Sequence, residues 1–130
     1  MIVVDASVMV EVLLFTPESS RAFRRIFSDG ESLHAPYLLD IEVAHALRRY
    51  SLWKEIEPQR GRDALDNLRA LMLTRHSHTA LLPRIWELRH NVTAYDGAYL
   101  ALAEMLAAPL LTCDRALASS SDHRAEVELV

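Results

Sequence analysis

Short apolar stretches alternate along this chain with longer stretches of helical periodicity, and this alternation constrains the fold more than any other feature. A continuous apolar run is typical of a buried strand, whereas apolar residues three or four positions apart are typical of a helix. Strands are expected at 2–4, 32–35, 110–113 and 126–130, with a short edge strand within 73–79. Strands separated by helices predict an α/β fold with a mostly parallel sheet of four to five strands and helices on both faces.

Proline, glycine and hydroxyl side chains mark the expected helix ends. Pro36 is interpreted as a helix start, because proline is favoured at the first helical position, and Gly30 as a helix stop. Thr93 and Asp96 have the spacing of a capping box, and Pro109 ends the helix that follows them. The other expected helices cover 7–14, 17–29, 36–50, 58–72 and 82–89.

The bulk composition fits one domain over residues 1–130. The chain has 130 residues, 51% of them hydrophobic and 25% charged, which suits a globular protein with a real core. No apolar run approaches the roughly 20 residues that cross a bilayer, so no membrane association is expected. The single cysteine, Cys113, excludes an internal disulfide and favours a cytoplasmic location. The net charge of −4 does not by itself indicate nucleic-acid binding, although 13 of the 14 basic residues are arginine.

Acidic residues follow two of the expected strands directly. Asp5 comes after strand 2–4, and Asp114 comes after strand 110–113. Carboxyl ends of parallel strands meet at one edge of a sheet, where sites form when the strand order reverses. Asp96 lies in the first turn of a helix, and Glu42 lies in the first turns of the helix after another strand. The four acids are therefore expected to converge at one edge.

Each acid also has an ordinary structural interpretation. Asp5 can cap the helix that begins near residue 7, and Asp114 can cap the short segment after it. Asp96 can be an ordinary capping-box acid with no further role, and Glu42 can be an exposed helix acid paired with an arginine. The four together at these positions favour a shared site.

Clustered carboxylates repel one another, and a divalent cation relieves this repulsion. Mg²⁺ and Mn²⁺ prefer oxygen ligands, commonly one or two carboxylates together with water and substrate phosphate. Such an ion suits phosphodiester hydrolysis, because it activates water and stabilises charge on the phosphate. Two bound divalent ions would also bring the net charge from −4 to 0.

The chain resembles the PIN-domain ribonucleases, specifically the VapC-type toxins of bacterial type II toxin–antitoxin pairs. The resemblance rests on MIVVDASVMVEVLL, APYLLDIEVAHALRR, NVTAYDGAYLALAEMLAAPLLTCDRAL and HRAEVELV, which are spread over essentially the whole chain. It implies a PIN-like three-layer α/β/α sandwich. It also implies catalytic, metal-binding roles for the acids at the matching positions: Asp5, Glu42, Asp96 and Asp114. Ser7, Thr112 and Asn91 match positions that support the site by hydrogen bonding.

The resemblance further implies an activity and partners. A Mg²⁺- or Mn²⁺-dependent endoribonuclease would cleave structured RNA such as tRNA or rRNA and so inhibit translation, leaving a 5′-phosphate and a 3′-hydroxyl. A cognate VapB-type antitoxin would neutralise it, and such toxins commonly form homodimers that join antitoxins in heterotetramers or larger assemblies. Arg115, directly after the last site acid, is the best candidate for a phosphate contact.

Other interpretations make different demands on the residues. A response-regulator receiver needs an acidic pair after the first strand and a late lysine, but the only lysine is Lys54. A haloacid-dehalogenase-type phosphatase needs an acid two residues after Asp5, where Ser7 stands. Three alternatives remain open: a PIN nuclease outside a toxin–antitoxin pair that processes RNA, one that acts on DNA, and a degenerate PIN module that only binds. Departures from the family pattern are His45, where relatives often have asparagine, and the apolar Leu117 and Ala118, which leave a second metal site in question.

Overall fold

The computed structural model describes residues 1–130 and has a central sheet of five strands, all parallel, in the order β3-β2-β1-β4-β5. This confirms the α/β class and the upper end of the expected strand count. The strands are β1 (Ile2–Val4), β2 (Leu33–Pro36), β3 (Leu73–His76), β4 (Leu110–Thr112) and β5 (Val127–Leu129).

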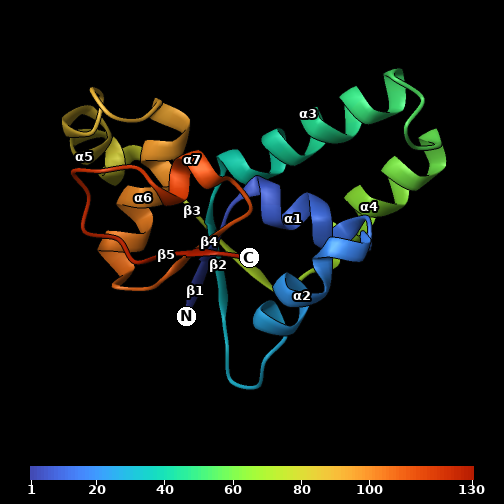
Figure 1. The fold of residues 1–130 in the computed structure, drawn as a ribbon, viewed down its shortest axis with the longest axis horizontal. Helices are drawn as coiled ribbons and strands as arrows, with labels where there is room; N and C mark the ends of the chain where they lie inside the picture. The colour runs from blue at the N-terminus through green and yellow to red at the C-terminus, as the bar shows by residue number, and fades with distance from the viewer.

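Helices cover both faces of the sheet and give three layers (Figure 1). One layer holds α1 (Ala6–Leu13), α2 (Ser20–Ile26), α3 (Leu38–Leu52) and α4 (Pro58–Ala70). The opposite layer holds α5 (Leu82–Glu87) and α6 (Ala94–Leu106), and the short α7 (Arg115–Ala118) follows β4. Two single-turn 3₁₀ segments, Pro17–Ser19 and Thr79–Leu81, precede α2 and α5. None of these helices is both long and apolar enough to cross a membrane.

The two central strands form the middle of the core. Val3 pairs with Leu110 and Val4 with Leu111, and every residue of β1 and β4 is 0% exposed. Continuous burial on both faces is what a parallel strand between two helical layers requires. Because β1 and β4 lie side by side and in parallel, the residues that follow them, Asp5 and Cys113–Asp114, emerge at the same edge of the sheet.

The predicted start of the third helix at Pro36 is wrong. Pro36 is the last residue of β2, opposite His76 of β3, and α3 begins at Leu38. Proline is tolerated here because β1 pairs only with Leu33 and His34, so no neighbour needs an N–H donor from Pro36. The N–H of the next residue, Tyr37, donates to His76 instead.

One smaller expectation also changes. The segment expected as one helix over 17–29 is a 3₁₀ turn followed by α2, which ends at Ile26 before Gly30 adopts a φ of 81°. Asp40 accepts two hydrogen bonds from the Arg75 guanidinium, at 2.7 and 2.9 Å. This ion pair joins the first turn of α3 to the edge strand β3.

Candidate active site

Asp5 is the best-anchored of the four acids. Its side chain lies between β1 and α1 and is only 6% exposed. Oδ1 accepts hydrogen bonds from the Val8 N–H at 3.0 Å and the Ser7 hydroxyl at 2.6 Å, and Oδ2 accepts one from the Thr112 hydroxyl. Asp5 is therefore both the N-cap of α1 and a buried carboxylate with three donors.

The two hydroxyl groups that bind Asp5 are themselves oriented by backbone N–H groups. The Cys113 N–H donates to Ser7 Oγ at 2.9 Å, and the Asp114 N–H donates to Thr112 Oγ1 at 2.9 Å. Each hydroxyl thus accepts from the chain after β4 and donates to Asp5. These bonds place Ser7 and Thr112 against Asp5.

Asp114 begins α7 in the same way that Asp5 begins α1. Its Oδ1 accepts from the N–H groups of Ala116 at 2.7 Å and Leu117 at 3.4 Å. The capping interpretation of Asp5 and Asp114 is therefore correct. Capping uses only Oδ1 of Asp114 and leaves Oδ2 without a protein hydrogen bond. Asp114 can therefore cap α7 and still offer an oxygen to the site.

Asp96 lies in the first turn of α6, where the Thr93 hydroxyl accepts its backbone N–H at 3.1 Å. This is half of the predicted capping box, because the Asp96 carboxylate does not accept the Thr93 backbone N–H in return. The carboxylate is left to face the other acids.

Glu42 approaches from the opposite helical layer, on α3. Its Oε2 accepts a hydrogen bond from the Tyr99 hydroxyl of α6 at 2.7 Å. Tyr99 was not identified from the sequence, where it looks like one more apolar residue of a buried helix. The only available signal was its position three residues after Asp96, on the same helix face.

The charges of the acids affect one another. Burial raises the pKa of Asp5, with a further contribution from the charge of Asp114 and opposition from its three hydrogen bonds. Burial also raises the pKa of Glu42, and the charges of Asp96 and Asp5 add to the effect. Asp96 follows the same pattern, with burial first and then the charges of Asp114 and Asp5. All four carboxylates therefore belong to one electrostatic cluster at the carboxyl edge of the sheet.

The donor set fits a hard divalent cation. The cluster offers only carboxylate oxygens, and Mg²⁺ is commonly bound through one or two carboxylates with water completing its coordination. No three His, Cys, Asp or Glu side chains are gathered tightly enough to form a ready-made cage. A cation whose coordination is completed by water needs only one or two carboxylates in direct contact, so three gathered side chains are not required.

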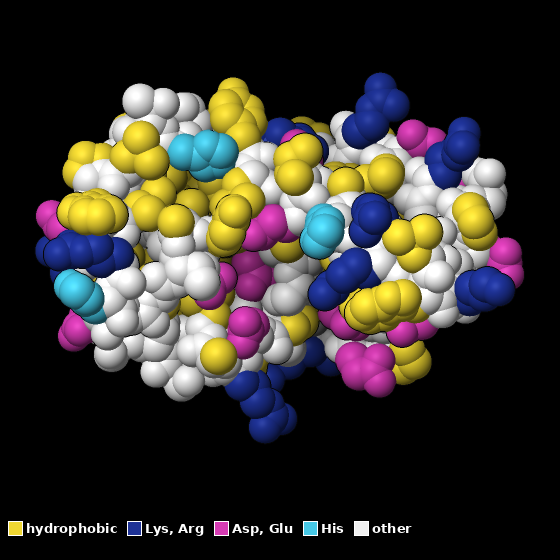
Figure 2. Space-filling model, turned by 90° about the horizontal axis from the view of Figure 1, so that it is seen from above, with side chains coloured by type: hydrophobic (Ala, Val, Ile, Leu, Met, Phe, Trp, Pro, Cys, Tyr) yellow, Lys and Arg dark blue, Asp and Glu magenta, His cyan; other side chains and the backbone are white.

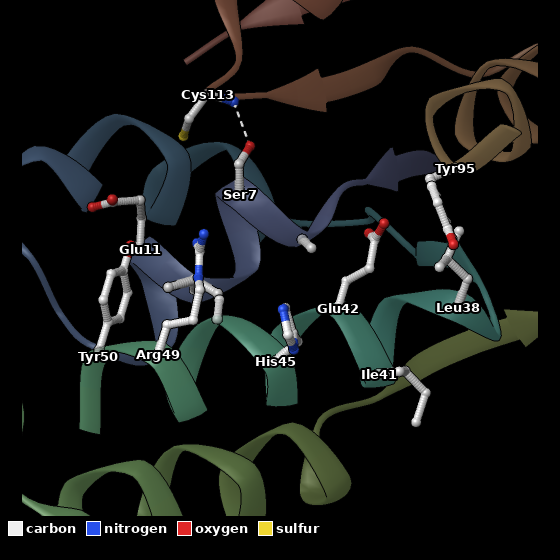
Figure 3. A pocket seen from close by; sticks show the side chains of 13 residues that line it. Ser7, Glu11, Leu38, Ile41, Glu42, His45, Arg49, Tyr50, Tyr95 and Cys113 are labelled. Atoms are coloured by element: carbon white, nitrogen blue, oxygen red, sulfur yellow. Dashed lines mark hydrogen bonds between the residues drawn. The ribbon is translucent and has the colours of Figure 1, made fainter. Parts of the chain in front are cut away.

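A groove between α1 and α3 opens beside the cluster and has a volume of about 660 Å³. Figure 3 shows Glu42, His45 and Arg49 on its α3 wall, facing Ser7, Glu11 and Cys113 on the other. Figure 2 views the molecule from this side, where acidic side chains gather in the middle. Arginine and histidine side chains flank them on one side and hydrophobic side chains on the other.

Two other expected residues differ in their surroundings. Asn91 donates to Asp122 at 2.6 Å and has no hydrogen bond to any of the four acids, so the structure gives it no supporting role in this cluster. The mismatch arises because Asn91 precedes α6 in a turn that packs toward the loop after α7.

Arg115 is exposed at the start of α7 without an ion-pair partner, so its guanidinium is free for an anionic ligand.

Comparison with known proteins places the chain in a family. The sequence profile described as "PIN domain" matches residues 2–121. The chain belongs to the PIN-domain family. Its relatives include Ribonuclease VapC12 of Mycobacterium tuberculosis, 42% identical over 130 residues that cover 100% of this chain and 99% of the relative. Ribonuclease VapC1 of the same organism is 44% identical over 129 residues, 98% of this chain and 96% of the relative.

Solved structures share the fold at much lower sequence identity. VapBC2 from Rickettsia felis, bound to a promoter DNA fragment, superposes with a TM-score of 0.72 at 14% identity, over 99% of this chain and 98% of that one. Mycobacterium tuberculosis VapC20, described as a sarcin–ricin loop cleaving toxin, gives a TM-score of 0.68 at 17% identity over 95% and 99%. The α/β/α arrangement is therefore shared with these solved structures.

Proposed function

We propose that this PIN-domain protein is a Mg²⁺- or Mn²⁺-dependent endoribonuclease toxin of the VapC type, acting in the cytoplasm on structured RNA such as tRNA or rRNA. The observation that carries the proposal is the convergence of four carboxylates from separate elements into one electrostatic cluster. Support comes from relatives named VapC ribonucleases, which match over nearly their full length at 42–44% identity.

Asp5, Asp96, Asp114 and Glu42 would hold the ion. When bound, it supplies positive charge to the scissile phosphate and activates water for attack. Ser7 and Thr112 fix the Asp5 carboxylate through their hydroxyl groups. Arg115, free of acidic partners beside Asp114, is placed to bind a phosphate of the RNA. Glu42 and Asp96 are half-buried, so water screens their charges less and their attraction for a cation is stronger.

The proposed partner is a VapB-type antitoxin that blocks the acidic cluster. Solved structures with this fold include toxin–antitoxin complexes from Klebsiella pneumoniae and Rickettsia felis. We propose a homodimer of the toxin that joins antitoxins in a heterotetramer or larger assembly. Exposed apolar side chains that line the groove beside the cluster, including Ile41 and Tyr95, supply surface for such contacts.

The decisive experiment combines cleavage in vitro with RNA-end sequencing after brief induction. Purified protein with Mn²⁺ should cut structured RNA, leave 5′-phosphate ends and spare a DNA of the same sequence. EDTA should stop cleavage. In cells, induction should arrest growth, and co-expression of the adjacent small antitoxin gene product should restore it. Cleavage that persists in EDTA would refute the metal mechanism. Cleavage of DNA alone, or binding of RNA without cleavage, would refute the ribonuclease assignment, and unaffected growth would refute the toxin role.

A further inference from the structure

Tyr99 is a buried polar side chain with a single polar partner. Its side chain is only 2% exposed, and its hydroxyl makes one hydrogen bond, to Glu42 Oε2 at 2.7 Å. A buried hydroxyl without a partner carries a desolvation cost, so buried tyrosines usually find a hydrogen-bond acceptor. A phenylalanine would fill the same apolar space among α6 and the sheet. The hydroxyl therefore requires an explanation beyond packing, and its only contact points to Glu42.

Glu42 needs a positioning partner more than the neighbouring acids do. Asp5 and Asp114 have short side chains, and backbone N–H groups at helix N-termini hold each of them. Glu42 projects from the interior of α3, where backbone N–H groups are already used, and its longer side chain has more rotatable bonds. Tyr99 provides its only hydrogen bond. Without that bond, the carboxylate could turn into the open groove between α1 and α3, which Glu42 also lines (Figure 3).

The position of Tyr99 on α6 connects two sides of the acid cluster. Asp96 and Tyr99 are three residues apart and lie on one helix face. This face of α6 carries Asp96 itself, and through Tyr99 it also orients Glu42, which comes from α3 in the opposite layer. The bond uses only Oε2, so Glu42 Oε1 has no protein partner and remains free to bind a cation.

From this geometry we propose that Tyr99 is a positioning residue, whose hydroxyl fixes Glu42 in the orientation that binds the divalent ion. The proposal rests on the metal-dependent function proposed above and assigns that site an additional residue. Groups that hydrogen-bond to metal-binding carboxylates typically change metal affinity or activity by about 10–100-fold when they are removed. A loss of that size is the expected effect of removing the hydroxyl.

The test is Tyr99→Phe, studied first without RNA. Titration with Mn²⁺ in a calorimeter should show about 10–100-fold weaker binding than for the unmodified protein. The matched control is Tyr37→Phe, since Tyr37 is exposed and its hydroxyl has no hydrogen bond, and it should bind Mn²⁺ normally. Thermal unfolding in EDTA separates the two roles. A purely structural role would lower the melting temperature yet leave the Mn²⁺ affinity of the folded protein unchanged.

A double-mutant cycle makes the test specific to Glu42. In a Glu42→Ala background, Tyr99→Phe should cause no further loss of Mn²⁺ affinity, because the residue it orients is gone. If the phenylalanine variant does not fold, the same measurements are made on Tyr99→Met, which also lacks the hydroxyl and fills apolar space. Suppose that the unmodified protein binds Mn²⁺ and cleaves RNA. Normal Mn²⁺ affinity in Tyr99→Phe would then overturn the positioning role of Tyr99 and leave the proposed function standing. An unmodified protein that neither binds Mn²⁺ nor needs it for cleavage would overturn the proposed function as well.

Discussion

The Ser7 hydroxyl donates a hydrogen bond to Asp5 Oδ1 at 2.6 Å while it accepts one from the Cys113 N–H at 2.9 Å. Thr112 makes the equivalent pair of bonds, to the other oxygen of Asp5 and from the Asp114 N–H. Two hydroxyl groups thus connect the backbone after β4 to a carboxylate at the start of α1. Any displacement between β4 and α1 changes the position of Asp5, so packing of the sheet and geometry of the acid cluster are coupled.

Thr112→Val tests this coupling. The change keeps the shape of the side chain but removes the donor to Asp5 and the acceptor of the Asp114 N–H. We expect a loss of about 1–3 kcal/mol in the free energy of unfolding, and a fall of about 10–100-fold in RNA cleavage. Thr74→Val in the edge strand is the control, because Thr74 is exposed and its hydroxyl has no protein partner. Equal effects of the two substitutions would contradict a specific role for Thr112.

Asp5→Asn should abolish RNA cleavage. The amide retains the size of the side chain but removes the charge at the most buried position of the cluster. Stability without metal should change by no more than about 1–2 kcal/mol, because relief of like-charge repulsion opposes the loss of one accepted hydrogen bond. Asp29→Asn, at an exposed site without hydrogen bonds, should cleave normally. Cleavage by Asp5→Asn at the unmodified rate would remove Asp5 from the active site.

Mn²⁺ should raise the melting temperature, and EDTA should reverse the rise. A ligand that binds only the folded state at 100 times its dissociation constant adds about 2.7 kcal/mol to the free energy of unfolding, which corresponds to several degrees. The shift should be largely lost in Asp96→Asn, because one carboxylate that faces the ion is neutral. Scanning calorimetry of both proteins with and without Mn²⁺ provides the measurement. Identical melting temperatures in Mn²⁺ and EDTA for the unmodified protein would argue against a metal site.

Glu104 provides a pH-dependent contribution to stability remote from the acid cluster. Arg84 of α5 donates to both Glu104 oxygens, at 2.8 and 3.0 Å, and lowers the pKa of this carboxyl below its ordinary value of 4.5. The contribution is therefore present above pH 4.5 and is lost as the pH falls through the lower folded-state pKa. Glu104→Gln should cost about 1–3 kcal/mol at pH 7, since the Glu104 side chain is only 7% exposed.

Urea unfolding at several pH values checks this prediction. The difference between the unmodified protein and Glu104→Gln should narrow as the pH falls from about 5 to about 3, because both side chains are then neutral. The control is Glu87→Gln, whose carboxylate pairs with the same arginine but is 64% exposed. An exposed pair contributes about 0–1 kcal/mol, so this variant should differ little at any pH. A difference for Glu104→Gln that is constant across the pH range would exclude the ion pair as its cause.

Much of the acid cluster could be predicted because local rules determine it. A buried strand followed at once by an aspartate is visible in the sequence, and parallel strands bring such residues to one edge. For Asp5 and Asp114 the structural and functional interpretations were never exclusive, since each caps a helix with one oxygen and faces the cluster. Pro36 shows the limit of a local rule. Its preference for a helix start was overruled by strand pairing with β3, which depends on residues 40 positions away.

Contacts between distant segments could not be inferred from one sequence. The Tyr99–Glu42 hydrogen bond joins residues 57 positions apart and depends on how α3 and α6 pack across the sheet edge. The Asp40–Arg75 and Asn91–Asp122 pairs have the same origin, with separations of 35 and 31 residues. From its own segment, Tyr99 looked like one more buried apolar residue, and Asn91 looked like a supporting residue of the site. In each pair, a partner from elsewhere in the chain determined the contact that the side chain makes.

The Thr112–Asp5 bond has a consequence for how the protein is made. Its two residues are 107 positions apart, so Asp5 leaves the ribosome long before the strand that orients it has been synthesised. Until β4 emerges and inserts beside β1, the growing chain lacks both the hydrogen bond from Thr112 to Asp5 and the Asp114 side chain. The acid cluster can therefore assemble only late in synthesis, after β4 has inserted beside β1.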